Sequence, residues 1–244
     1  MKFKHTDDWL YLSGERFSSG RAFDFTYEPE DFQYQSRIDV LKRLVTGKQL
    51  IHLGCVDEVA TIRHRMARGK WLHKELDEVA ERCLGVDINE AGVDFINNEL
   101  GFRDVIVHDV TQPPTDDLAE RTWDYFMVPE VLEHIDNPVY FLKKIRQHFE
   151  TNVSRMIITV PNAFTPENMR NARNGREVIN TDHRYWFTPF TLAKVVLGAG
   201  YHIENIIMCR HGRVKRRSFI KNRTFKKHPL TRSDIVMVAR FVRP

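Results

Sequence analysis

The sequence predicts an α/β protein in which a mostly parallel sheet is covered by helices on both faces. Three observations lead to this fold class. Short apolar runs alternate along the chain with longer segments whose apolar residues recur at helical spacing. Several of these runs end at a glycine, an acidic residue or a proline, as strands do at the ligand-binding edge of such a sheet. The last two runs have no helical pattern between them, which indicates an antiparallel hairpin at one edge.

The expected strands are apolar runs bounded by residues that favour turns. LIHLG ends in a glycine, and WDYFMV is stopped by Pro129. In chain order, the predicted strands cover residues 50–54, 83–88, 104–110, 123–128, 155–161, 201–210 and 233–242.

The expected helices carry apolar residues on one face, and two of them also have clear caps. Residues 136–149 have Asn137 as a cap and Pro138 at the first helical position. Residues 188–200 begin with a threonine cap and a proline and end in a glycine. Apolar periodicity predicts further helices at residues 29–45, 71–83 and 93–100.

The chain divides into an N-terminal arm with a covering helix, residues 1–47, and a domain, residues 48–244, that carries a basic insertion at residues 208–230. Residues 208–228 contain nine Lys or Arg and no acid, although the whole chain has a net charge of only +4. Such a run is most often a solvated loop. As a binding surface it would attract an anionic acceptor, a membrane surface in a peripheral contact, or nucleic acid. The sequence contains no recognised nucleic-acid module, which argues against nucleic acid.

Targeting and cysteine patterns bear on the cellular compartment. No apolar stretch is long enough to span a bilayer, and the first residues lack the apolar core of a signal peptide. Cys55, Cys83 and Cys209 are odd in number, far apart and without nearby cysteine or histidine pairs. The sequence therefore predicts a cytoplasmic protein with neither a disulfide framework nor a metal site.

Acidic residues follow three successive expected strands. Gly54 ends the first strand, Asp87 and Asp109 end the next two, and Glu130 follows the fourth. A carboxylate after the second strand can accept hydrogen bonds from both hydroxyls of a ribose, and Asp109 is placed to receive an adenine amine. Each Asp alone is more often a cap or turn residue. Their occurrence at successive strand ends favours a nucleoside site.

Six stretches carry a resemblance to a known family: LIHLGC, LGVDI, IVHDV, WDYFMVPEVLEHIDNPVYFLKKI, MIITVPNAF and DHRYWFTPFTLAKVVLGAGY. In this order, over residues 48–205, they resemble the class I S-adenosylmethionine-dependent methyltransferases, of the type that modifies sugars and natural products. The VLEHIDNP block is the most specific part. The resemblance implies a Rossmann-like, seven-stranded, mostly parallel sheet with an antiparallel last strand and helices on both faces.

The resemblance also implies S-adenosylmethionine as cofactor and S-adenosylhomocysteine as product. The turn at Gly54 would approach the amino-acid end of the cofactor, Asp87 would hold the ribose, and Asp109 with Val110 would flank the adenine. The residues expected at the cofactor are Gly54, Cys55, Asp57, Asp87, Ile88, Asp109, Val110 and Glu130.

Two departures concern the glycine turn. Val56 and Glu58 stand where further glycines are usual, and Gly54 and Asp87 are farther apart than the ~20 residues of the dinucleotide-binding pattern. S-adenosylmethionine has no phosphate and carries a positive sulfonium and an ammonium group, so acids such as Asp57 suit it better than they suit a pyrophosphate. The turn therefore argues against NAD or FAD more than against a methyl donor.

Methyl transfer needs alignment of acceptor and methyl group, and a hydroxyl acceptor benefits from a general base. The candidate catalytic residues are Glu133 and His134, after the fourth strand, and His183, in a polar and aromatic segment before the last helix. The alternative roles are structural: Glu133 and His134 would bridge a loop, and the segment around His183 would be an ordered, packed loop.

The sequence thus predicts a methyltransferase that acts on an oxygen or nitrogen of a small-molecule or glycan-type acceptor. Two alternatives remain open. One is a catalytically inactive protein of the same fold that serves in binding or assembly, suggested by the missing glycines. The other is an NAD-type oxidoreductase. The acceptor and the oligomeric state are left open.

Overall fold

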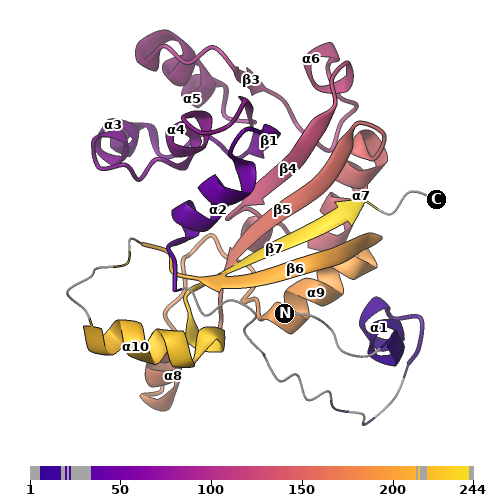
Figure 1. Ribbon diagram of the computed structural model, residues 1–244, viewed down its shortest axis with the longest axis vertical. Helices are drawn as coiled ribbons and strands as arrows, with labels where there is room; N and C mark the ends of the chain where they lie inside the picture. Colours follow the sequence, from indigo (N-terminus) through magenta and orange to yellow (C-terminus); the bar gives the residue numbers. More distant parts are fainter. Residues whose placement is uncertain are drawn as a thin grey trace.

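The protein is described by a computed structural model that covers residues 6–17, 20, 22, 34–212, 214 and 219–241. Its strands are β1 (Gln49–Leu53), β2 (Arg82–Asp87), β3 (Val105–Val107), β4 (Trp123–Pro129), β5 (Val153–Pro161), β6 (Tyr201–Cys209) and β7 (Asp234–Phe241). They form one seven-stranded sheet in the order β3-β2-β1-β4-β5-β7-β6 (Figure 1). β7 runs antiparallel to β5 and β6, and the other neighbouring pairs are parallel. The predicted fold class is confirmed.

The last two strands pair antiparallel as predicted, but the prediction of a connection without a helix is wrong. The helix α10 (Phe219–Lys227) and the short 3-10 helix η3 (Pro229–Thr231) separate them in the chain. The α10 sequence, FIKNRTFKK, is mainly basic and polar, so it lacks the apolar periodicity that would have indicated a helix. β7 lies between β5 and β6, and its first residue, Asp234, pairs with Pro161 at the end of β5.

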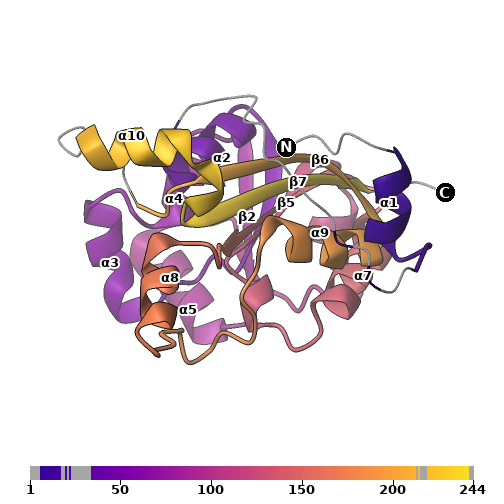
Figure 2. The ribbon, with the colours of Figure 1, turned by 90° about the horizontal axis from the view of Figure 1, so that it is seen from below.

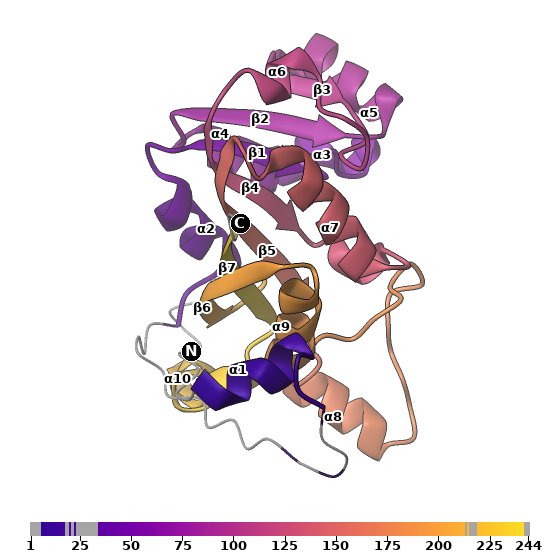
Figure 3. The ribbon, with the colours of Figure 1, turned by 90° about the vertical axis from the view of Figure 1, so that its right-hand side faces the viewer.

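Helices cover both faces of the sheet, as Figures 2 and 3 show. The main covering helices are α2 (Arg37–Val45), α4 (Leu72–Asp77), α7 (Pro138–Phe149) and α9 (Pro189–Gly198). α2 and α4 pack on one face through Leu41 and Leu76, and α7 and α9 pack on the other through Phe149 and Leu192. Because the central strands are buried on both sides, their sequences are nearly continuous apolar runs.

The remaining helical elements of the described ranges lie at the ends of the strands or at the periphery. They are α1 (Thr6–Ser13), α3 (Val59–Ala67), α5 (Glu90–Asp94), η1 (Phe95–Glu99), α6 (Asp116–Ala119), η2 (Leu132–His134) and α8 (Pro166–Arg173). α1 lies against α9, where Lys194 Nζ donates a hydrogen bond to the Tyr11 carbonyl at 2.8 Å. None of the described helices is long and apolar enough to cross a membrane.

The capped helices agree with the predictions. Asn137 accepts the Tyr140 N–H and starts α7. Thr188 starts α9 and forms a reciprocal capping box with Thr191. Helix starts that carry these chemical signals could therefore be placed from the sequence.

The helix predicted at 29–45 begins later than expected. Its first described turn starts at Arg37, because Ser36 Oγ accepts the Asp39 N–H and caps it. Residues 29–33 lie outside the described residues. The prediction that residues 1–47 form a separate arm stays a prediction.

Two other helical segments also differ. The helix predicted at 71–83 ends at Asp77, and Arg82 already belongs to β2. Residues 61–70, for which no helix was predicted, belong mostly to α3. Apolar periodicity continues across the end of α4 because Cys83 is buried as well, on a strand rather than on the helix.

The turn after β1 contains Val56 in place of a glycine, and α5 accommodates this side chain. A Cβ at Gly92 would lie 2.3 Å from Val56 Cγ1, far inside a van der Waals contact. Valine at position 56 thus requires glycine at position 92. The Val56 N–H donates a hydrogen bond to Asp87 Oδ2 at 2.9 Å and fastens the turn to the end of β2. The single-glycine turn is therefore held in place by the Val56–Gly92 contact and the Val56–Asp87 hydrogen bond.

We expect Gly92→Ala to lower the free energy of unfolding by about 1–3 kcal/mol, as an overpacked core position does. In an unhindered helix the same change would add about 1 kcal/mol of stability. In a Val56→Ala background the clashing Cγ1 is gone, so the cost of Gly92→Ala should largely disappear. Urea unfolding of the four proteins measures this coupling.

Gly198→Ala in α9 is the matched control, because the nearest side-chain atom to its Cβ would be 3.8 Å away. It should be neutral or stabilising. An equal cost of Gly92→Ala in both backgrounds would contradict the steric explanation.

Candidate functional site

A cleft of about 940 Å³ opens at the carboxyl ends of the parallel strands. Most of the residues that the sequence singled out lie along it. At one end are Gly54, Cys55 and Asp57; at the other are Glu130, Glu133, His134 and His183. Asp87, Ile88, Asp109 and Val110 are not among its lining residues and lie beside it, at the ends of β2 and β3.

The turn after β1 forms one end of the cleft. Gly54 has a left-handed φ of 68°, and a Cβ there would lie 3.0 Å from Val131 Cγ2, so this position needs glycine. Asp57 forms an ion pair with Arg65 of α3. The Cys55 side chain is buried, and its carbonyl accepts the Trp71 Nε1–H at 3.2 Å. Cys55 thus packs as a small buried side chain.

Asp87 lies at the end of β2 with 9 % of its surface exposed. Its Oδ2 accepts the Val56 N–H at 2.9 Å and its Oδ1 accepts the Asn89 N–H at 3.0 Å. A carboxylate has about four acceptor positions, so each oxygen can accept one more hydrogen bond. The next side chain, Ile88, is 73 % exposed, an unusual position for a large apolar residue beside a cleft. Together they offer paired acceptors next to an apolar platform.

Asp109 and Val110 follow β3 in different environments. Asp109 Oδ1 accepts both the backbone N–H and the hydroxyl of Thr111. Val110 is only 2 % exposed and belongs to the main apolar core. A ligand could meet Val110 through its backbone but not through its side chain.

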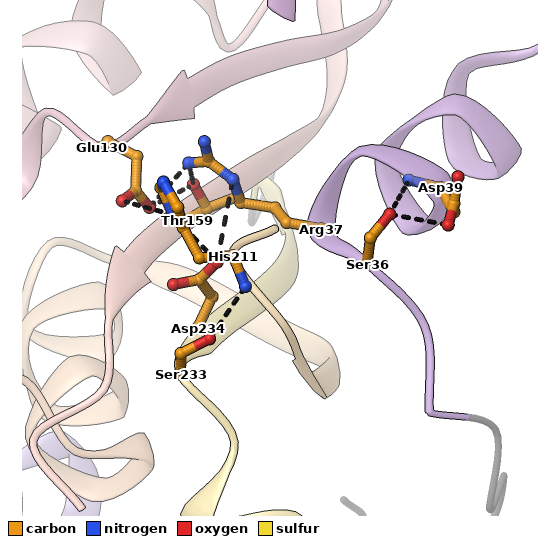
Figure 4. Close-up of polar contacts among 8 residues, drawn as sticks. All are labelled: Ser36, Arg37, Asp39, Glu130, Thr159, His211, Ser233 and Asp234. Atoms are coloured by element: carbon orange, nitrogen blue, oxygen red, sulfur yellow. Dashed lines mark hydrogen bonds and ion pairs between the residues drawn. The ribbon is translucent and has the colours of Figure 1, made fainter. Parts of the chain in front are cut away.

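An ionic network, shown in Figure 4, contributes Arg37, Glu130 and Asp234 to the lining of the cleft. Arg37, from the covering helix α2, donates from Nη1 to Glu130 Oε1 at 2.9 Å and to Thr159 Oγ1 at 3.2 Å. Its Nε lies 3.9 Å from Asp234 Oδ2. Although burial opposes it, the charges of Glu130 and Asp234 raise the pKa of Arg37. The network thus holds a permanent cation against two carboxylates.

His211 completes this network at the cleft surface. Its Nδ1 lies 3.3 Å from Asp234 Oδ2, and its backbone N–H donates to Ser233 Oγ at 2.8 Å. The hydrogen bond with Asp234 raises the pKa of His211. Neither His211 nor Asp234 was among the site residues predicted from the sequence. The signal that could have found Asp234 is the antiparallel direction of β7, which brings its first residue to the edge where parallel strands end.

Glu130 also has an uncommon backbone conformation. Its φ of 54° is the single positive value among the described residues other than glycine. Such conformations persist where the surroundings enforce them, often at functional sites. Here the Glu130 N–H donates to the Thr159 carbonyl at 2.8 Å while the side chain is held by Arg37.

Glu133 is a buried carboxyl without a partner. It is 1 % exposed, and neither of its oxygens accepts a hydrogen bond from any described residue. Burial, assisted by the negative charge of Glu130, raises the pKa of Glu133 to about 8. At neutral pH this carboxyl therefore mostly holds its proton. A buried polar group left unpaired is costly, which points to a function.

Two histidines lie beside Glu133. The rings of His134 and His183 meet edge to face with their centroids 4.7 Å apart. His134 Nδ1 lies 3.2 Å from the Asp182 carbonyl, an acceptor, so Nδ1 carries the proton and Nε2 keeps its lone pair. Burial and the neighbouring His134 lower the pKa of His183. The His183 ring therefore favours its neutral form, which offers a lone pair.

The two segments that carry this cluster are 49 residues apart in the chain and are tied by backbone contacts. The Arg184 N–H donates to the Glu133 carbonyl at 2.7 Å. Tyr185 Oη donates to the Asp136 carbonyl at 2.6 Å, and Arg184 pairs with the Asp136 side chain. The loop that follows α8 is therefore positioned directly over η2.

Donor atoms of Glu133, His134 and His183 all lie within 4.8 Å of one another. One carboxylate and two imidazoles suit a divalent cation. A bound cation would give the Glu133 carboxylate the partner that it lacks. The sequence predicted all three as catalytic candidates but no metal ligand. The same group can also act on a proton directly, so its chemistry is either cation binding or acid–base exchange.

Comparison with known proteins identifies the fold further. A family profile described as "Methyltransferase domain" matches residues 38–206. No curated protein matches the chain.

Among solved structures, similar ones include the magnesium protoporphyrin IX methyltransferase ChlM from Synechocystis PCC 6803 with bound SAH, at 14 % identity and a TM-score of 0.52 over 84 % of this chain and 82 % of that one. A putative S-adenosylmethionine-dependent methyltransferase from Listeria monocytogenes has 13 % identity and a TM-score of 0.52, over 84 % and 96 %. The small RNA methyltransferase HEN1 has 17 % identity and a TM-score of 0.56, over 93 % of this chain and 27 % of that one. At these identities the likeness concerns the fold.

The raised pKa of Glu133 predicts a pH-dependent stability. Because the folded state holds the proton up to about pH 8, stability should fall as pH rises from about 5 to about 8, with a slope of at most about 1.4 kcal/mol per pH unit. The glutamine in Glu133→Gln does not titrate, so the contribution of this carboxyl to the pH dependence of the free energy of unfolding should be lost. Urea unfolding across this range, with a chelator present, would compare the two proteins. Parallel curves would show that Glu133 titrates normally.

Proposed function

The chain belongs to the class I S-adenosylmethionine-dependent methyltransferases, and on that basis we propose that it methylates a hydroxyl oxygen of a small-molecule or glycan-type acceptor. The observation that carries this proposal is the group of Glu133, His134 and His183 at one end of the cleft. An unprotonated amine is nucleophilic enough to be methylated without such a group, whereas the lone pairs of a neutral hydroxyl are much weaker nucleophiles. A hydroxyl must lose its proton as it is methylated.

The turn after β1 and the residues that follow β2 and β3 fit the methyl donor. Asp87 has free acceptor positions for the two ribose hydroxyls, and the exposed Ile88 offers an apolar surface for a purine. Gly54 leaves the backbone open to close approach. Asp57 is already paired with Arg65, so we assign it to the ammonium group only as part of that pair. We assign Asp109 and the backbone of Val110 to the adenine.

When bound, the cofactor supplies a methyl group activated by its sulfonium. The chain's own contribution is positioning, exclusion of water and removal of one proton. Glu130 adds negative charge where the donor is positive. The Arg37 network holds Glu130 in place and closes the cleft on the side of α2.

We assign removal of the acceptor's hydroxyl proton to the Glu133 cluster. We propose that His134 Nε2, His183 and Glu133 bind a divalent cation that lowers the pKa of the acceptor hydroxyl. The unpaired carboxyl of Glu133 supports this assignment over direct proton transfer, because a protonated carboxyl is a poor base near neutral pH. Direct transfer to His183 is the second candidate.

The rest of the cleft supports a neutral, polar acceptor. Beyond His183 the lining includes Trp186, Asn168 and Asn180, which offer an aromatic edge and amide hydrogen bonds. Sugar hydroxyls and ring faces suit such surfaces. The basic segment at residues 208–230 is a further candidate contact for an anionic acceptor, since Arg223, Lys226 and Lys227 are exposed on α10.

The alternative is a catalytically inactive protein of this fold that serves in binding or assembly. The missing glycines motivated it, but Val56 is accommodated by Gly92 without loss of the turn. Calorimetry with S-adenosylhomocysteine separates the two functions: no binding at millimolar concentrations would favour the inactive protein.

Asp87→Ala should weaken binding of S-adenosylhomocysteine by ~10-fold or more, as expected for a lost charge-assisted contact of ~1.5–3 kcal/mol. Asp117→Ala, an exposed change on α6, is the control and should bind normally. Titration calorimetry on folded variants checks this. Unchanged affinity in Asp87→Ala would remove the ribose assignment.

Glu133→Gln and His183→Ala should each lower kcat at least ~100-fold with little change in cofactor affinity, as loss of a general base or metal ligand does. Chelator treatment should abolish the activity, and Mg²⁺ or Mn²⁺ should restore it. A screen of hydroxylated acceptors with radiolabelled donor provides the assay. Activity that survives exhaustive chelation would assign the proton to His183 instead.

A further inference from the structure

A second group of metal-ligating side chains lies behind the turn after β1, apart from the Glu133 cluster. His52 comes from β1, His73 from α4 and Cys83 from β2, and all three are about 1 % exposed. His52 Nδ1 and His73 Nδ1 are 3.1 Å apart, and Cys83 Sγ is 3.7 Å from His73 Nδ1. The three donor atoms all lie within 4.8 Å of one another.

Hydrogen bonding alone does not satisfy this arrangement. An imidazole nitrogen has one position in the ring plane, which holds either a proton or a lone pair. His73 Nδ1 can therefore form a good hydrogen bond with His52 or with Cys83, but not with both. A cation between the three atoms would use all of their lone pairs at once.

The distances match those of a zinc-class ion. With bonds of about 2.0–2.1 Å to nitrogen and about 2.3 Å to sulfur in a tetrahedral site, ligand atoms lie about 3.3–3.6 Å apart. The observed separations of 3.1 and 3.7 Å bracket this range. We propose that His52, His73 and Cys83 bind a zinc-class divalent ion that joins β1, α4 and β2.

The surroundings suit such an ion. The His73 ring lies against Gly85, where a Cβ would be 2.9 Å from His73 Cε1, so the backbone leaves room for the ring. Burial lowers the pKa of both imidazoles, that of His73 to about 4, and keeps them neutral. Burial raises the pKa of the Cys83 thiol, so its thiolate would form together with ion binding.

The group is reachable from solvent. His52 and His73 both contribute to the lining of the cleft, so an ion can enter from there, and a water molecule can occupy the remaining position. This site could not be recognised from the sequence, because His73 is 21 residues from His52 and 10 from Cys83. The proposal does not depend on the acceptor chemistry or on the Glu133 cluster.

Cobalt(II) is the probe, because thiolate-to-cobalt charge transfer gives a near-ultraviolet band that oxygen and nitrogen ligands do not produce. We expect the full-length protein, stripped of metal, to bind one equivalent of Co²⁺ with this band and to lose the band when Zn²⁺ is added. Zn²⁺ should also raise the melting temperature of the stripped protein, since an ion that binds only the folded state stabilises it.

Cys83→Ser and His73→Gln should abolish the band and reduce the zinc-dependent rise in melting temperature to the part that the Glu133 cluster alone provides. Cys209→Ser, a change at a buried cysteine outside the group, should keep both, and so should Glu133→Gln, which alters the other cluster. Absence of the band in the unaltered protein would overturn the proposal even if a variant fails to fold. Loss of the band in Cys55→Ser with retention in Cys83→Ser would also overturn it.

Discussion

The buried guanidinium of Arg37 is the constraint around which the cleft is built. It pairs with Glu130 at the end of β4, reaches Thr159 on β5 and lies beside Asp234 at the start of β7. A buried cation without its carboxylates would cost several kcal/mol, so each partner fixes the others. One side chain of α2 thereby holds three strand ends in register. The shape of the cleft follows from this arrangement.

The same network sets the electrostatics of the neighbouring cluster. Held by Arg37, the Glu130 carboxylate adds negative charge beside Glu133 and helps burial to raise the pKa of that carboxyl. The rings of His134 and His183 lie beside it, and burial lowers the pKa of His183. A region that already keeps a proton on a buried acid is well suited to exchange that proton for a divalent ion. In the proposed mechanism, donor binding and acceptor activation meet at Glu130 and Glu133.

The sequence predicted the features that depend on local chemistry. Apolar runs located the strands, and the Asn137 and Thr188 caps located two helix starts. Features that depend on tertiary contacts could not be predicted in this way. The basic helix α10 has no apolar pattern of its own, and Asp234 reaches the cleft because β7 runs backwards between two strands.

The pairing of Val56 with Gly92 has a consequence for the redesign of this protein. The two residues are one steric unit divided between a loop and a helix. In a mutant library that varies the loop alone, the helix limits the size of the side chain that position 56 can hold. In a library that varies the helix alone, Val56 disfavours every residue larger than glycine at position 92. Cofactor analogues with bulkier groups therefore call for libraries in which positions 56 and 92 change together.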